Sequence, residues 1–204
     1  DIIGLGAGEP DFDTPAHVVA AAIKAMQEGK TRYTPAAGTL ELRQAICRKL
    51  KRDNGLTYEP TDIVVSNGAK HSLFNALHAV CNPGDEVLLP APYWVSYYEL
   101  IKMAGATPVL VTATEENGYL VTAQQLRDAI TDKTKALILN SPCNPTGAVY
   151  PDGRLMEIAA LAVEKDIYVI SDEIYECLVY DGAVHTAIAS FGPEIKDLTV
   201  VVNG

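Results

Sequence analysis

ALILNSPCNPTG at residues 136–147 and IYVISDEIY at residues 167–175 are the most informative stretches of this sequence. Each begins with a short apolar run of strand length, and residues 154–165 between them repeat apolar side chains at helical spacing. Two continuous apolar strands joined by a helix form a parallel unit, and parallel sheets are covered by helices on both faces. These stretches therefore predict an α/β fold of three layers, in which helices lie on both faces of a mostly parallel sheet.

Polar residues follow both of these strands. Asn144 lies in the loop after the first strand, and Asp172 and Tyr175 follow the second. Because ligands of parallel sheets bind beyond the carboxyl ends of the strands, we expect Asn144 and Asp172 at the same edge. Glu173 is expected to point away from Asp172, since successive side chains of a strand face opposite sides. An aspartate here can also be a simple turn or helix cap, so the residues alone leave both interpretations open.

A second candidate ligand site begins at Ile63–Val65, which has the composition of a buried strand. The small-residue turn Ser66–Lys70 follows and opens a helix, and helix N-termini bind anions because their first amides lack partners. Gly68 and Ala69 permit the close backbone approach that a phosphate monoester needs. Lys70 is disfavoured by the helix dipole unless an anion is bound there. The turn lacks both the GxGxxG and the GxxxxGK[ST] pattern, which argues against dinucleotide and P-loop sites.

The rest of the chain alternates helix and strand signals. Helices are expected at residues 16–27, 39–54, 97–104 and 122–130, and strands at residues 86–89, 108–111 and 198–202. Thr39 is expected to cap the second of these helices, and Thr122 with Gln125 forms a capping-box pattern at the fourth. Residues 176–193 are expected to be irregular.

Composition and charge argue against several classes of partner. The 204 residues are 48% hydrophobic and 21% charged, which suits a globular protein with a sizeable core. The formal net charge of −10 argues against nucleic acid and anionic membranes, since both require a basic surface. No apolar run approaches the roughly 20 residues of a membrane span. Cys47, Cys81, Cys143 and Cys177 show no zinc-site spacing, so we expect reduced thiols, no metal and a cytoplasmic protein.

The sequence resembles the class I/II aminotransferases, which are pyridoxal-phosphate (PLP) enzymes of the aspartate aminotransferase fold (fold type I). The motifs that carry this resemblance are, in chain order, GAGEPDFDTP (6–15), KTRYTPAAG (30–38), SNGAKHSLFN (66–75), APYWVSY (91–97), SPCNPTG (141–147) and SDEIY (171–175). They extend over essentially the whole chain. The resemblance implies transfer of an amino group between an L-amino acid and a 2-oxo acid by a homodimer.

The resemblance assigns chemistry to three residues at the sheet edge. Asp172 is expected to bind the pyridine nitrogen of PLP and to keep the ring electron-withdrawing. Tyr175 and the Asn144 amide are expected to donate hydrogen bonds to the ring oxygen O3′. Asp172 and Tyr175 are therefore the candidate catalytic residues.

The resemblance also implies a set of binding residues. The cofactor contacts are expected at Gly68, Ala69, Lys70, Trp94, Asn144, Asp172, Tyr175 and Tyr33, and the substrate contacts at Gly8, Trp94, Asn144 and Lys70. Trp94 would stack on the pyridine ring, whereas Tyr33 would cross a dimer interface to the neighbouring cofactor phosphate. A lone tryptophan is more often a core residue, and a loop tyrosine is more often half-buried packing, so these alternatives stay open.

The resemblance further implies two domains. Residues 1–32 are expected to be the N-terminal segment of a small domain, and residues 33–204 the PLP-binding large domain. In the family, the Schiff-base lysine, the arginine that binds the substrate carboxylate and an antiparallel strand of the sheet come after the position of Gly204. The large domain is thus expected to be incomplete, and the chain as written to be inactive.

Three functions remain compatible with these motifs. The first is an aspartate-type aminotransferase, which Lys70 favours because the aspartate-using members of this subgroup carry a lysine there. The second is another PLP chemistry on the same fold, such as a C–S β-lyase or an aminocyclopropane-carboxylate synthase. The third is a non-catalytic module that retains the PLP pocket.

Overall fold

The structure, a computed structural model, describes Gly8 and residues 12–204. The chain divides into two compact units, Asp1–Pro35 and Ala36–Gly204. The first unit contains helix α1 (Ala16–Gln27), whose limits agree with the predicted residues 16–27. The membership of residues 1–32 in a small domain stays a prediction.

The second unit is built on a five-stranded sheet with the order β2-β1-β3-β4-β5. Its strands are β1 (Glu86–Ala91), β2 (Thr107–Thr112), β3 (Thr134–Asn140), β4 (Tyr168–Asp172) and β5 (Thr199–Val202). Every neighbouring pair is parallel, so the predicted parallel α/β sheet is confirmed.

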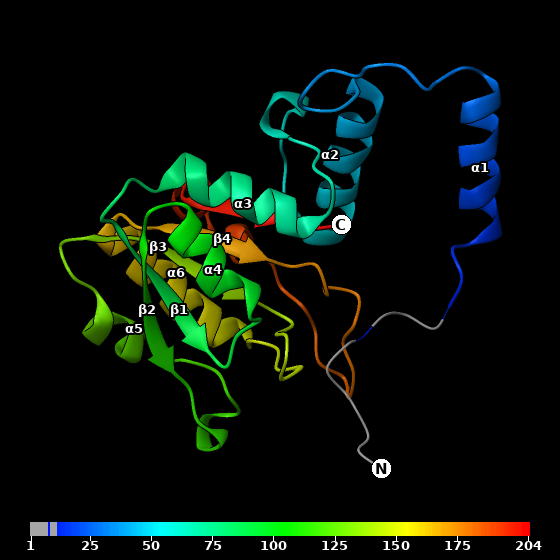
Figure 1. The fold of residues 1–204 in the computed structure, drawn as a ribbon. Coiled ribbons are helices and arrows are strands. Elements are labelled where there is room, and N and C mark those ends of the chain that lie inside the picture. Colours follow the sequence, from blue (N-terminus) through cyan, green and yellow to red (C-terminus); the bar gives the residue numbers. More distant parts are fainter. Residues whose placement is uncertain (1–7, 9–11) are drawn as a thin grey trace, which may run out of the picture. The chain divides into compact units, whose positions relative to one another are not determined.

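Helices cover both faces of this sheet (Figure 1). The α-helices of this unit are α2 (Leu40–Asn54), α3 (Ala69–Val80), α4 (Ser96–Met103), α5 (Ala123–Ala129), α6 (Asp152–Lys165) and α7 (Pro193–Asp197). Short 3₁₀ helices lie at Pro60–Asp62, Glu115–Asn117 and Ile188–Phe191. Helices α3 and α4 pack on one face, and α5, α6 and α7 on the other.

Alternation along the strands divides the core between these two faces. In β3, Ala136 and Ile138 pack with α3 and α4, whereas Leu137 and Leu139 pack with α5 and α6. All four side chains are at most 1% exposed, which explains why the strand reads as a continuous apolar run. The same alternation brings Asn140 to the face of α3 and α4, the face on which Ile138 lies.

The predicted capping residues are confirmed. The Thr39 hydroxyl accepts a hydrogen bond from the Leu42 amide at 3.3 Å, and α2 ends at Gly55, which is in the left-handed conformation. Thr122 and Gln125 form a reciprocal capping box at the start of α5. These helices therefore begin and end where local chemistry directs.

Two predicted segments differ in the structure. Ile63–Val65 is not a strand: Val64 is 63% exposed, and the Val65 amide donates a single hydrogen bond, to the Ala37 carbonyl. An apolar triplet becomes a strand only when a neighbouring strand pairs with it, and this segment lies outside the sheet. Residues 176–193 are largely irregular as predicted, except for the 3₁₀ turn at Ile188–Phe191.

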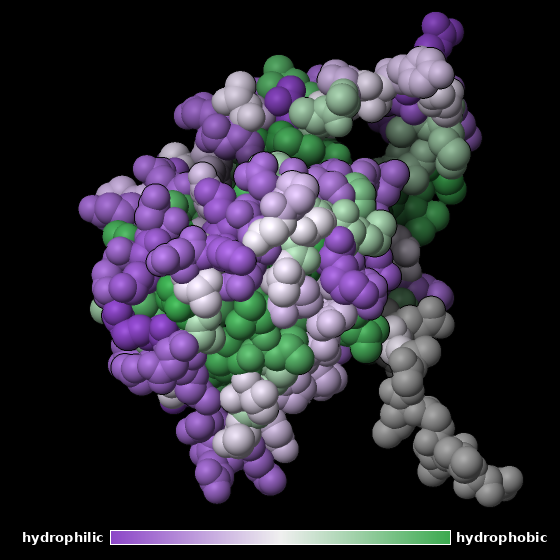
Figure 2. Space-filling model, turned by 60° about the vertical axis from the view of Figure 1, so that its left-hand side comes forward, coloured by the Kyte–Doolittle hydropathy of each residue, from purple (hydrophilic) through white to green (hydrophobic). Residues whose placement is uncertain are grey.

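On the side shown in Figure 2, hydrophilic residues cover most of the surface around a smaller hydrophobic area. In the described part of the chain, no helix has both the length and the apolar character needed to cross a membrane.

Candidate active site

Asn140 and Asp172 end two neighbouring strands in register. They are paired residues of the β3–β4 ladder, with exposed fractions of 9% and 2%. Buried polar groups need hydrogen-bond partners, and both side chains have them. This pair forms the centre of the candidate site, at the carboxyl edge that the sequence predicted.

Asn140 joins the two predicted polar segments. Its amide nitrogen Nδ2 donates to the Asp172 carbonyl oxygen at 3.0 Å, and its Oδ1 accepts from the Asn144 backbone amide at 2.7 Å. Asn144 is half-buried in the loop after β3. Asn140 therefore fixes the distance between the Asn144 loop and the end of β4.

The Asp172 carboxylate is held at both oxygens. Oδ2 accepts a 2.6 Å hydrogen bond from the Tyr97 hydroxyl, and Oδ1 accepts one of 3.2 Å from the Ile174 amide. Burial raises the pKa of Asp172 above its ordinary value, and the bonds from Tyr97 and Ile174 oppose that rise. Burial and the neighbouring carboxylate raise the pKa of Tyr97 far above the usual range, so its hydroxyl stays protonated and donates.

Tyr97 connects Asp172 with Trp94 and, through Trp94, with Lys70 at the start of α3. Its ring meets the edge of Trp94 in a T-shaped contact, with ring centroids 5.4 Å apart. The Lys70 ammonium lies 4.8 Å from the centroid of the Trp94 ring. Lys70, Trp94, Tyr97 and Asp172 thus form one continuous series of contacts, although they come from α3, the loop between β1 and α4, α4 and β4.

The N-terminus of α3 offers free backbone donors. Gly68 precedes the helix with φ of +82°, and a Cβ built there has no atom within 4 Å, so the space in front of the turn is open. Within the described residues, the amides of Ala69 and Lys70 have no hydrogen-bond acceptor. Two free amides at the positive end of a helix dipole favour an anion.

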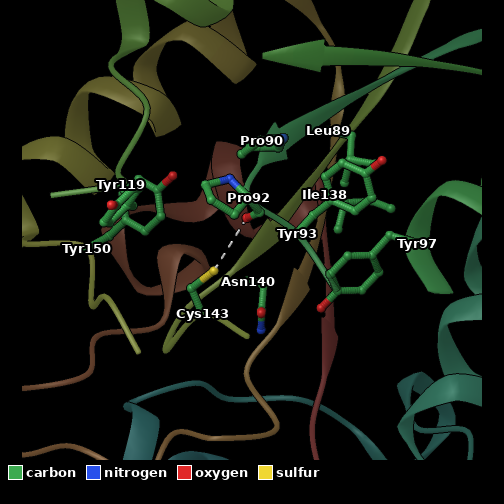
Figure 3. A pocket seen from close by; sticks show the side chains of 10 residues that line it. All are labelled: Leu89, Pro90, Pro92, Tyr93, Tyr97, Tyr119, Ile138, Asn140, Cys143 and Tyr150. Atoms are coloured by element: carbon green, nitrogen blue, oxygen red, sulfur yellow. Dashed lines mark hydrogen bonds between the residues drawn. The ribbon is translucent and has the colours of Figure 1, made fainter. Parts of the chain in front are cut away.

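A small pocket lies beside this site, at the ends of β1 and β3 (Figure 3). Tyr97, Asn140, Cys143 and Tyr150 are among its lining residues. In Figure 3 the Tyr97 ring enters the pocket with its hydroxyl toward the side where Asn140 lies. The Cys143 thiol is 3.8 Å from the Pro92 carbonyl, which joins the Asn144 loop to the end of β1.

Glu173 points away from Asp172, as alternation predicted. Its Oε1 accepts from the Ser171 hydroxyl at 2.8 Å, and its Oε2 lies 3.1 Å from His185 Nε2. Glu176 is the third member of this group, with ligand-type atoms of all three residues within 4.8 Å of one another. Lys49 of α2 forms an ion pair with Glu176, so an ammonium already balances this carboxylate.

Three other predicted site residues, Tyr175, Gly8 and Tyr33, differ in burial and in the unit to which they belong. Tyr175 is half-buried, three residues after Asp172. Gly8 and Tyr33 are exposed and belong to the first unit. The roles proposed for these three residues, and for the rest of the predicted site, stay predictions.

Two residues of the site were missed from the sequence, Tyr97 and Asn140. A signal existed for each. Asn140 is the last residue of a buried strand, two positions beyond Ile138 on the same face. Tyr97 belongs to the same APYWVSY motif as Trp94 and follows it by three positions, where α4 begins.

Comparison with known proteins gives a consistent result. The sequence matches the family described as aminotransferase class I and II over residues 1–204. The aspartate aminotransferase of Bacillus sp. (strain YM-2) is 55% identical over 204 residues, which are 100% of this chain and 52% of that protein. A bifunctional aspartate aminotransferase and glutamate/aspartate-prephenate aminotransferase of Petunia hybrida is 54% identical, across 100% of this chain and 42% of that protein.

Solved structures show the same similarity. Aspartate aminotransferase from Thermus thermophilus with maleate superposes with a TM-score of 0.93 at 49% identity, covering 97% of this chain and 51% of that one. Aromatic aminotransferase from Pyrococcus horikoshii OT3 gives a TM-score of 0.96 at 47% identity, covering 100% and 54%. The chain spans about half the length of the curated relatives it matches. By its sequence and its fold, the chain belongs to the aminotransferase class I and II family.

Proposed function

We propose that the protein containing this chain is a PLP-dependent aminotransferase. It would move an amino group between an L-amino acid, with aspartate preferred, and a 2-oxo acid. The observation that carries the proposal is the buried Asp172 carboxylate and its connection to the N-terminus of α3. Asp172 contacts Tyr97, Tyr97 contacts Trp94, and Trp94 contacts Lys70. The aspartate aminotransferases among its relatives support it.

The residues present fit the cofactor at its nitrogen end. When bound, PLP supplies an electron sink for the bonds at the α-carbon of the substrate. Asp172 would bind the pyridine nitrogen, because a buried carboxylate with both oxygens held is a fixed acceptor for a charged N–H. Asn144 and Tyr175 would donate to the ring oxygen.

The residues also fit the phosphate end. Gly68 leaves open space, and the amides of Ala69 and Lys70, which have no acceptor in the described part of the chain, lie at the positive end of a helix of 12 residues. Trp94 is half-buried and lies between this turn and Tyr97. It would stack on the pyridine ring and exclude water from one of its faces.

Lys70 supports a preference for acidic substrates. Its ammonium is exposed at the site and has the Trp94 ring as its neighbour. We propose that it attracts either the cofactor phosphate or the distal carboxylate of aspartate. Gly8, Trp94 and Asn144 are the further substrate contacts in this proposal, with Gly8 presenting its backbone amide to the α-carboxylate.

The proposal extends to the whole protein, since this chain spans about half of its relatives. Residues 1–32 would belong to a small domain, and residues 33–204 to a PLP-binding large domain that the remaining sequence completes with its Schiff-base lysine. The protein would act in the cytoplasm as a homodimer, in which Tyr33 contacts the cofactor phosphate of the neighbouring subunit.

The test uses this chain extended to the length of its relatives, called here the extended protein. We expect it to bind PLP and to convert aspartate and 2-oxoglutarate into oxaloacetate and glutamate. Asp172→Ala is expected to lose turnover far more than cofactor retention. Absence of PLP binding by the extended protein would overturn the proposal.

Substrate preference needs a separate measurement. Lys70→Met is expected to raise KM for aspartate about tenfold, the loss of one charge-assisted contact, with a smaller effect for an aromatic amino acid. Lys102→Met is the matched control, because Lys102 also lies over an aromatic ring, 5.5 Å from the centroid of Tyr98. Release of pyruvate from cysteine derivatives without transamination would indicate a β-lyase. PLP binding without any turnover would indicate a non-catalytic module.

A further inference from the structure

The Tyr97 side chain contacts both Asp172 and Trp94. Its hydroxyl donates to Asp172 Oδ2 at 2.6 Å, across 75 positions of sequence. Its ring packs edge-on against Trp94 at an interplanar angle of 87°. The side chain is buried, with an exposed fraction of 2%.

We propose that Tyr97 is a positioning residue for the cofactor: its hydroxyl holds the Asp172 carboxylate ionised and oriented so that a free lone pair faces the pyridine nitrogen. This inference rests on the proposed function, since it presumes that PLP binds at Asp172.

The hydrogen bonds restrict how the carboxylate can turn. Rotation of Asp172 about its last torsion would break the bond from Tyr97 to Oδ2 and the bond from the Ile174 amide to Oδ1. A carboxylate offers about four lone-pair sites, so two remain after these bonds are made. The fixed orientation directs the remaining sites, which reduces the reorganisation needed when a charged N–H arrives.

The same bond favours the ionised form of Asp172. Burial, with a smaller effect of the Glu173 charge, raises the pKa of Asp172, whereas the Tyr97 hydroxyl and the Ile174 amide act in the opposite direction and lower it. Cys143 and Tyr175 also lie near the Tyr97 hydroxyl. A proton on Asp172 would remove the negative charge that keeps the pyridine nitrogen protonated, so the hydroxyl protects the charge that the cofactor needs.

One substitution can remove the bond to Asp172 without removing the contact with Trp94. Tyr97→Phe removes the hydroxyl and retains the ring that packs on Trp94, so any change reports on the bond to Asp172. Tyr98→Phe is the matched control: Tyr98 is the next residue of α4, is half-buried, and stacks on Tyr93 with ring centroids 6.4 Å apart. Site-specific 3-fluorotyrosine at position 97 keeps the shape and makes the hydroxyl a stronger donor.

Three measurements on the extended protein test the inference. Carboxyl ¹³C NMR of the cofactor-free form reports the pKa of Asp172, which should rise in Tyr97→Phe and fall with 3-fluorotyrosine. The ¹⁵N shift of labelled PLP should move toward unprotonated pyridine in Tyr97→Phe. Loss of a hydrogen bond to a charged group should lower the kcat of Tyr97→Phe by about tenfold or more, whereas its KM for aspartate should change little.

The outcomes separate this inference from the proposed function. If wild-type protein binds no PLP, the proposed function fails. If wild-type protein binds PLP and Tyr97→Phe leaves the Asp172 pKa and the ¹⁵N shift equal to those of Tyr98→Phe, the inference is wrong. If Tyr97→Phe does not fold, unchanged values with 3-fluorotyrosine overturn it equally.

Discussion

Asn140 stands directly opposite Asp172 in the β3–β4 ladder, and its amide group bonds the Asp172 carbonyl on one side and the Asn144 amide on the other. One buried side chain therefore sets the position of two residues predicted to bind the cofactor. Because both of its bonds are to backbone groups, it fixes the chain path at the sheet edge, independently of the side chains of Asn144 and Asp172.

We expect Asn140→Ala to lower the free energy of unfolding by about 1–3 kcal/mol, because it removes two hydrogen bonds. The half-buried Asn144 amide loses its acceptor, whereas the Asp172 carbonyl keeps the bond from the Ser141 amide at 3.2 Å. It should also weaken PLP binding, since the Asn144 loop loses its anchor. Urea unfolding and PLP titration of the extended protein measure both effects. Asn75→Ala, on the exposed side of α3, should leave both unchanged. Equal PLP affinity in Asn140→Ala and wild type would contradict the anchoring role.

Asp172→Asn is expected to stabilise the fold at neutral pH while impairing function. Burial raises the pKa of Asp172, so the stability that this group contributes is fully present below the ordinary carboxyl pKa of 3.8 and is lost as pH rises through the folded-state pKa. The neutral amide avoids that loss, and it can accept from Ile174 while donating to the Tyr97 oxygen.

Urea unfolding of wild type and Asp172→Asn at about pH 7 and about pH 4 measures this difference. The variant should have the larger unfolding free energy at the higher pH, and the gap should shrink at the lower pH. A wild type that is more stable at the higher pH would show that its hydrogen bonds outweigh the burial of its charge.

Glu173 is expected to be a structural residue. Glu173→Ala removes the partner of the Ser171 hydroxyl and of His185 Nε2, both in the interior, so we expect a loss of about 1–3 kcal/mol in unfolding free energy. Glu164→Ala, which breaks an exposed pair with Arg127, should cost much less. Folded Glu173→Ala protein should bind PLP as wild type does, because the side chain lies on the opposite face from Asp172. Loss of PLP binding with an intact fold would assign Glu173 to the site.

Gly38 and Gly55 differ in why a larger residue would be unfavourable at each position. Both have positive φ, +95° and +70°, but a Cβ at Gly38 would lie 2.6 Å from Val65 Cγ2, whereas none is near at Gly55. Gly55→Ala should therefore cost about 1–2 kcal/mol from backbone conformation alone. Gly38→Ala should cost about 1–3 kcal/mol more from overpacking. Equal losses in thermal or urea unfolding would show that the Val65 segment moves aside freely.

Much of the site was predictable because parallel sheets gather the carboxyl ends of their strands at one edge. Asp172 and Asn144 were expected there on that ground, and Glu173 was expected to face away by alternation. Tyr97 could not be paired with Asp172 in the same way, because their contact spans 75 positions and depends on where α4 packs. Ile63–Val65 failed as a strand for a related reason, since local composition does not show whether a partner strand is available.

The sequence by itself determined most of the alternation of strands and helices, the caps at Thr39 and Thr122, and the opposite directions of Asp172 and Glu173. Periodicity and capping are local properties, so they are readable without the fold. Only the tertiary structure decided that Asn140 would join the Asn144 loop to β4 and that Tyr97 would bond Asp172. Such contacts depend on strand register and helix packing, which arise from many weak long-range interactions that no short stretch of sequence contains.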